Sequence, residues 1–155
     1  MTDFSIKSTA FKEGELIPPK FTCDGDDVNP FLEFRGVPEG TQSLALVVDD
    51  TDSTRGGIFD HWLIWNITPG TQYVSEDNIP SDAVQGSNSW GKPSYGGPCP
   101  PLGGVEHRYR FIAYALDTML ELPAGSSRLD LEYAMTGHIL AEATLLGRYA
   151  RTKEY

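Results

Sequence analysis

The sequence predicts a mostly β protein. Three observations support this fold class: apolar runs of strand length, breaks between them rich in glycine and proline, and helix signals confined to the last fifth of the chain. The 155 residues include 16 Gly and 11 Pro, which suits short strands joined by loops better than a helical bundle. The length fits a single domain over residues 1–155, and 39% hydrophobic residues are typical of a folded globular chain.

Three segments are predicted as the main strands. Ser43–Asp49 (SLALVVD) is a short run rich in branched apolar residues, so it is expected to be buried on both faces. The segment His61–Ile67 (HWLIWNI) has the same character, and His107–Leu116 (HRYRFIAYAL) is predicted as a third strand. Two weaker strands are predicted at Phe4–Ser8 and Phe31–Phe34.

A short helical segment is predicted near the C-terminus. Ser126-Ser127 offers an N-cap, and the apolar residues that follow recur at helical spacing: Leu129, Leu131, Met135, Ile139 and Leu140. The segment Thr144–Tyr149 is compatible with a helix or a last strand, and we favour the strand. The long Gly- and Pro-rich stretch from Ser87 to Gly104 is predicted as a loop, and a loop of this length in a compact domain is usually functional.

The net charge and the two cysteines limit the classes to which the protein can belong. There are 12 Lys and Arg against 22 Asp and Glu, so the net charge is −10, which argues against a nucleic-acid-binding protein. No apolar run approaches the length of a membrane span, and residues 1–12 lack the apolar core of a secretory signal, so we expect a cytoplasmic protein without stable membrane insertion. Cys23 and Cys99 could form one bridge, although in a cytoplasm they would normally stay reduced.

Polar, titratable side chains collect where the three main strands end or begin. Because successive side chains of a strand point to opposite faces, His107 and Tyr109 share one face. Asp50 and Asp52 follow the first strand and project to one side if the chain stays extended, and His61 begins the second. If these strand ends converge, they form a pocket with two carboxylates, two imidazoles and a phenol.

Each of these signals also has a structural explanation. An Asp-x-Asp pair after a strand is usually a solvated turn. A histidine beside a tryptophan, as in His61-Trp62, is usually a half-buried packing residue, and Tyr109 alone is most simply a core aromatic. It is their joint placement that favours a functional site.

Three motifs resemble those of one protein family. The first is Phe21-Thr22-Cys23-Asp24-Gly25, and the second is the segment 46–52 (LVVDDTD) followed by His61-Trp62-Leu63-Ile64-Trp65-Asn66. The third is Gly96-Gly97-Pro98-Cys99-Pro100-Pro101 followed by His107-Arg108-Tyr109. In this order they resemble the phosphatidylethanolamine-binding protein (PEBP) family, also called the Raf kinase inhibitor protein family, and its short bacterial and archaeal branch. The resemblance covers nearly the whole chain.

The resemblance implies a fold, a site and an activity. The expected fold is a PEBP-like β-sandwich of two antiparallel sheets with a short C-terminal helical segment. At one end lies a small pocket that binds an anion such as phosphate, a phosphoryl headgroup or a carboxylate. Carried over motif by motif, the anion-binding residues are Asp50, Asp52, His61, Gly97, His107 and Tyr109. The family's Asp-Pro-Asp-Ala-Pro reads Asp50-Thr51-Asp52-Ser53-Thr54 here, so the shape of the rim after Asp52 is expected to differ.

The predicted function is small-anion binding with a regulatory role, namely inhibition of a kinase or a protease, as the resemblance implies. Carboxylates beside histidines favour protonated imidazoles, so affinity for an anion should rise as the pH falls from about 8 to about 6. The alternative is a hydrolase or a metal-dependent enzyme that uses the Asp/His pocket. We assign no catalytic residue, no metal and no cofactor, and the resemblance also implies a homodimer.

Overall fold

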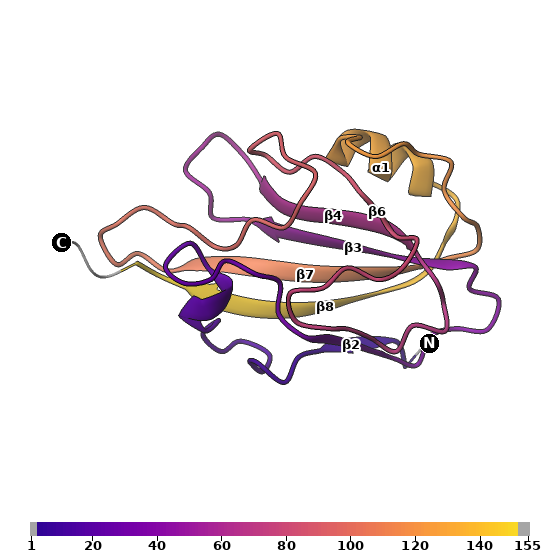
Figure 1. The fold of residues 1–155 in the computed structure, drawn as a ribbon, viewed down its shortest axis with the longest axis horizontal. Helices are drawn as coiled ribbons and strands as arrows, with labels where there is room; N and C mark the ends of the chain where they lie inside the picture. The colour runs from indigo at the N-terminus through magenta and orange to yellow at the C-terminus, as the bar shows by residue number, and fades with distance from the viewer. Residues whose placement is uncertain (1–2, 152–155) are drawn as a thin grey trace.

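The computed structural model describes residues 3–151, and it contains two antiparallel sheets and one short α-helix (Figure 1). The smaller sheet has the order β1-β2-β5, and the larger has the order β6-β4-β3-β7-β8. The elements are β1 (Ser5–Lys7), the 3-10 helix η1 (Pro19–Phe21), β2 (Leu32–Arg35), β3 (Ser43–Asp50), β4 (Phe59–Ile67), β5 (Tyr73–Val74), β6 (Val84–Gln85), β7 (His107–Leu116), α1 (Arg128–Met135) and β8 (Ile139–Tyr149). The predicted mostly β fold of two antiparallel sheets is confirmed.

The five-stranded sheet lies between the small sheet and α1, and it is covered on both faces (Figure 1). Side chains of β3 alternate between two apolar clusters: Leu46 and Val48 pack toward the small sheet, and Ala45 and Val47 pack toward α1. All eight residues of β3 are buried. This two-sided burial explains why the central strands read as continuous apolar runs rather than alternating ones.

The helix begins where the sequence predicted and ends earlier. Ser127 is the N-cap, and it forms a capping box with Asp130. The helix ends at Met135, because Gly137 adopts a φ of 83° and turns the chain back toward the sheet. The assignment of Ile139 and Leu140 to the helical pattern was therefore wrong: β8 starts at Ile139 and pairs with β7 along its length. The strand favoured for Thr144–Tyr149 is confirmed as part of β8.

Buried charges tie α1 to the sheet. Asp49 on β3 is fully buried, and its two carboxylate oxygens accept hydrogen bonds from the Arg110 guanidinium on β7 at 2.8 and 2.6 Å. Arg128 at the start of α1 donates to Asp49 at 3.1 Å and to Asp60 on β4 at 2.6 Å. This network fixes one end of the helix over the three central strands. No helix in the described part of the chain is long and apolar enough to cross a membrane.

We predict that Asp49→Ala destabilises the fold by about 3–5 kcal/mol, because it leaves two partly buried guanidinium groups without their shared carboxylate. Urea denaturation followed by circular dichroism measures the loss. Asp52→Ala is the matched control, since Asp52 lies in the turn after β3 and binds the exposed Arg108 on β7. Equal losses in the two variants would show that the buried network does not hold the helix on the sheet.

Candidate functional site

The ends of three neighbouring strands meet at one end of the large sheet. Asp50, the last residue of β3, lies opposite Tyr109 on β7 and opposite Phe59 on β4. Because the pairing is antiparallel on both sides, β3 ends where β4 and β7 begin. The strands therefore bring Asp50, His61, His107 and Tyr109 into one region.

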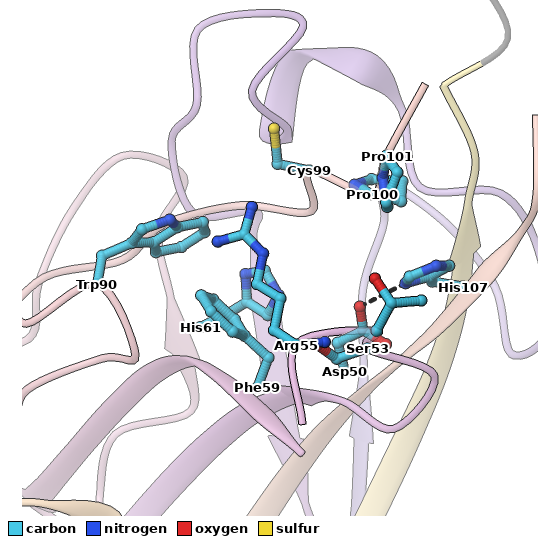
Figure 2. Close-up of a pocket in the computed structure, with 11 residues that line it drawn as sticks. Asp50, Ser53, Arg55, Phe59, His61, Trp90, Cys99, Pro100, Pro101 and His107 are labelled. Carbon is cyan, nitrogen blue, oxygen red and sulfur yellow. Dashed lines mark hydrogen bonds and ion pairs between the residues drawn. The ribbon is translucent and has the colours of Figure 1, made fainter. Parts of the chain in front are cut away.

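Asp50, His61 and His107 line one small pocket in this region (Figure 2). The remaining lining residues come from two loops and from the start of β4: Ser53, Thr54, Arg55, Phe59, Trp90, Cys99, Pro100 and Pro101. The cavity has a volume of about 20 Å³, close to what a single water molecule requires. The pocket thus fits a compact polar group, and a larger ligand requires the rim to move.

A buried hydrogen bond joins Asp50 to His107. Nδ1 of His107 and Oδ2 of Asp50 are 2.7 Å apart, and both side chains are almost fully buried, at 4% and 6% exposure. The other oxygen, Oδ1 of Asp50, accepts the backbone N–H of Asp52 at 2.8 Å. With both oxygens engaged, Asp50 fixes the orientation of the imidazole, and Nε2 of His107 is the ring atom left for a ligand.

His61 has a different environment. Its Nδ1 lies 2.8 Å from the carbonyl oxygen of Gly96, which can only accept, so Nδ1 carries the proton and Nε2 is free of it in the neutral ring. Burial lowers the pKa of His61 below its usual value, and the Gly96 carbonyl and the Asp50 carboxylate only partly offset this effect. At His61, burial therefore opposes the protonated imidazole that neighbouring carboxylates were expected to favour.

Tyr109 lies beneath these histidines. Its ring centroid is 5.3 Å from that of His61 and 6.5 Å from that of His107, and its side chain is fully buried. Its hydroxyl has no hydrogen-bond partner among residues 3–151. Burial, with the nearby Asp50 carboxylate, raises the pKa of Tyr109, so the phenol stays neutral and its O–H remains a hydrogen-bond donor. Tyr109 lies behind the residues that line the pocket and is not one of them.

Asp52 does not join the pocket. Its carboxylate binds Arg108 through both oxygens, with the guanidinium at 2.9 Å from each and the backbone N–H of Arg108 also at 2.9 Å. These hydrogen bonds lower the pKa of Asp52 to about 2. The alternation expected from Asp50 to Asp52 fails because the strand ends at Asp50 and the chain turns over residues 51–52.

Gly97 also lies outside the pocket lining. Its N–H donates to Oδ1 of Asp27 at 2.8 Å, and a Cβ at this position would lie 2.1 Å from the carbonyl oxygen of Phe21. Gly97 therefore allows the long loop to pack against the segment that follows η1. In the structure it borders a neighbouring groove, which is also lined by Lys92 and Tyr95.

Three lining residues were missed from the sequence. Phe59 could have been found, because it precedes His61 by two positions on the same face of β4. Arg55 and Trp90 lie in loops, where no periodicity indicates which way a side chain points. The rings of Phe59 and Trp90 pack edge-to-face at a centroid distance of 4.7 Å, and together they form an aromatic wall of the pocket.

The two cysteines, whose pairing the sequence left open, form a disulfide. Cys99 lines the pocket, and Cys23 belongs to the segment after η1, so the bridge anchors the wall formed by Pro100 and Pro101. Arg151 donates to Cys99 Sγ at 3.7 Å and to Asp24 at 3.1 Å. Among residues 3–151, no group of three or more His, Cys, Asp or Glu side chains is placed to hold a metal ion.

Comparison with known proteins gives one family. A family model described as phosphatidylethanolamine-binding protein matches residues 7–150. A UPF0098 protein of Aquifex aeolicus is 46% identical over 151 residues, covering 94% of this chain and 88% of that protein. A solved phosphatidylethanolamine-binding protein homologue from Chlamydia trachomatis superposes with a TM-score of 0.91 at 38% identity, over 97% of this chain and 99% of its own. YbcL of E. coli, a member of the mammalian PEBP family, superposes with a TM-score of 0.90 at 32% identity, over 96% and 98% of the two chains.

We predict that the double variant Cys23→Ser/Cys99→Ser loses about 4 kcal/mol of stability, because the bridge closes a loop of 76 residues. Guanidinium denaturation under non-reducing conditions measures the loss. A reductant should destabilise the unmodified protein by a similar amount and leave the double variant unchanged. A reductant that shifts neither transition would contradict a stabilising bridge.

Proposed function

The chain belongs to the phosphatidylethanolamine-binding protein family, and from that premise we propose that it binds a compact anion at the pocket of Asp50, His61 and His107. The anion is a phosphate, a phosphoryl group or a carboxylate. The ligand is held by local donors, because the net charge of −10 on the chain offers no general attraction for anions.

One observation carries this proposal: the buried hydrogen bond from His107 to Asp50 at the pocket wall. Because Nδ1 of His107 is engaged by Asp50, the ring is held with Nε2 as the atom available to a ligand. The orientation of the ring is therefore fixed before the ligand binds. A hydrogen bond from an imidazole N–H to an anion is charge-assisted and stronger than a neutral one.

His61 and Tyr109 contribute in different ways. A buried hydroxyl without a partner is unfavourable by about 1–3 kcal/mol, and a ligand oxygen that accepts from Tyr109 would remove this penalty. His61 is neutral when the pocket is free, and an anion near its ring stabilises the protonated form. Binding is therefore accompanied by proton uptake at His61.

Three expectations that are more specific than anion binding remain predictions. These are a regulatory role through inhibition of a kinase or a protease, a homodimer, and a cytoplasmic location. The alternative of a hydrolase or metal-dependent enzyme differs from the proposal in a measurable way, because it requires turnover of a phosphoryl substrate or a tightly held metal. Metal analysis of the purified protein and a phosphatase assay distinguish the two.

We predict that His107→Gln weakens the binding of inorganic phosphate roughly 10- to 100-fold, the loss typical of a hydrogen bond to a charged group. Isothermal titration calorimetry at pH 6.5 measures the change. His138→Gln is the matched control, since His138 is an exposed histidine that pairs with Asp117 away from the pocket. Unchanged affinity in His107→Gln, with folding intact, would overturn the proposed site.

The second prediction concerns pH. Sulfate is a suitable probe because it stays a dianion across the range. Since burial lowers the pKa of His61 below 6.5, its protonated form is disfavoured at neutral pH and becomes available only as the pH falls. Sulfate affinity should therefore rise as the pH falls from about 7.5 to about 5, and the rise should continue below 6.5.

The control for this pH dependence is His61→Gln, which should lose the part of the rise that lies below pH 6.5. Proton uptake is measured independently by calorimetry in two buffers with different ionisation enthalpies. A flat sulfate affinity over this range, with the protein folded throughout, would contradict recognition by imidazolium.

A further inference from the structure

We infer that the Cys23–Cys99 disulfide is a site of thiol–disulfide exchange with a dithiol reductant, and that its reduction frees the wall of the pocket formed by Pro100 and Pro101. Figure 2 shows Cys99 and these two prolines on one side of the pocket. The inference goes beyond the proposed anion site, because it adds covalent control of the pocket wall and does not depend on which ligand binds.

The first observation is that few backbone hydrogen bonds hold the wall. Residues 98–101 read Pro-Cys-Pro-Pro, and a proline has no N–H to donate. Within residues 3–151, this segment makes a single backbone hydrogen bond, in which the N–H of Cys23 donates to the carbonyl oxygen of Pro98 at 3.1 Å. Hydrogen bonding resumes at Gly97 and Gly103, whose N–H groups donate at 2.8 and 3.1 Å. Between these two glycines, the wall backbone is therefore attached by the disulfide and one hydrogen bond.

The other end of the bridge lies in a well-bonded turn. Thr22, next to Cys23, is fully buried. Its hydroxyl donates to the carbonyl oxygen of Pro19 at 2.8 Å and accepts the N–H of Asp24 at 3.1 Å. The bridge thus joins a sparsely bonded wall to a turn that its own hydrogen bonds hold. When the bridge is broken, the wall is the side that moves.

An attacking thiol can reach the bridge from the neighbouring groove. Both cysteines line this groove, which has a volume of about 370 Å³, and both are partly exposed. Lys92, an exposed cation of the same groove, favours the approach of a thiolate, which is the reactive form of a thiol. The groove therefore gives a reductant access to the sulfur atoms without unfolding of the chain.

The position of Arg151 indicates which sulfur leaves. Its guanidinium donates to Sγ of Cys99 at 3.7 Å and to Asp24 at 3.1 Å. A neighbouring guanidinium stabilises a thiolate, and a more stable thiolate leaves faster. Cys99 is therefore the leaving group, and Cys23 is the residue whose sulfur is attacked.

The exchange has two steps. A thiolate of the reductant forms a bond to Sγ of Cys23, the disulfide bond breaks, and its electron pair leaves with Cys99 as a thiolate. The second thiol of the reductant then loses its proton, attacks the reductant sulfur of the mixed disulfide and releases Cys23 as a thiolate. Two electrons and two protons pass to the protein, which gains two thiols, and the dithiol becomes a disulfide.

The first experiment measures access to the pocket through its histidines. Diethyl pyrocarbonate modifies neutral histidine rings, and peptide mass mapping gives the rate at each of the three histidines. His61 and His107 are buried at the pocket, and the exposed His138 serves as an internal reference. Cys23→Ser/Cys99→Ser mimics the reduced state without free thiols. We expect His61 and His107 to react at least about 10-fold faster in this variant, with His138 unchanged, because a freed wall opens locally.

Two results of this experiment would overturn the inference. Equal rates at His61 and His107 in the variant and in the unmodified protein would show that the bridge does not hold the wall. Circular dichroism that shows an unfolded variant would also overturn it, because reduction would then unfold the chain instead of freeing the wall.

The second experiment measures the exchange itself on the oxidised, folded protein. Dithiothreitol is the dithiol probe, and free thiols are counted by mass spectrometry after acid quenching and alkylation. Reduction should proceed without denaturant, and Arg151→Gln should slow it about 3- to 10-fold, since the leaving thiolate loses its cation. Arg35→Gln is the matched control, because Arg35 is an exposed arginine that pairs with Glu33 on the small sheet, and it should leave the rate unchanged.

A bridge that dithiothreitol reduces only in denaturant would overturn the exchange site. Equal rates in Arg151→Gln and Arg35→Gln would overturn the assignment of Cys99 as the leaving group. Neither experiment contains an anionic ligand, so these outcomes are distinguishable from a failure of the proposed function, which calorimetry with phosphate measures separately.

Discussion

The structure depends on the burial of β3 on both of its faces. Its residues alternate between a cluster under the small sheet and a cluster under α1, so a register slip of one residue would exchange the two sets and disrupt both. The register with β4 and β7 is thereby fixed by apolar packing far from the pocket. That same register places Asp50 opposite Tyr109 and Phe59, and it brings His107 within hydrogen-bond distance. The site geometry is thus a consequence of core packing, and its loops only complete the walls.

The sequence predicted the parts of the site that lie in regular strands. Alternation correctly placed His107 and Tyr109 on one face, and the three strand ends do converge. The same rule failed at Asp52, because the carboxylate of Asp50 accepts the N–H of Asp52 and the chain turns there. Helical spacing failed at Ile139 for a similar reason, since Gly137 ends the pattern with a left-handed φ. The direction of Arg55 and Trp90 depends on tertiary contacts of loops, which no local pattern of residues encodes.

Three carboxylates at the end of β3 and just after it, Asp49, Asp50 and Asp52, differ in the chemical type of their partners. Asp49 is bound by two arginines, which stay charged at any pH at which the protein folds, so this network is fixed. Asp52 is likewise bound by Arg108. Asp50 alone among the three pairs with a histidine rather than an arginine. An imidazole has a second ring nitrogen for another partner, so the histidine beside Asp50 can also contact a ligand.

An acidic protein can still bind an anion at one site if the range of its own field is short. At physiological ionic strength charges separated by more than about 8 Å in solvent are largely screened, so most of the net charge of −10 acts weakly on the pocket. Interactions inside the pocket are screened less, because its wall is formed by buried side chains and aromatic rings. Two donors of the pocket lining differ in exposure: His107 is buried, and Arg55 is exposed to solvent. A hydrogen bond from the buried imidazole becomes stronger once water is expelled from the pocket, whereas the exposed guanidinium can meet an anion before it enters.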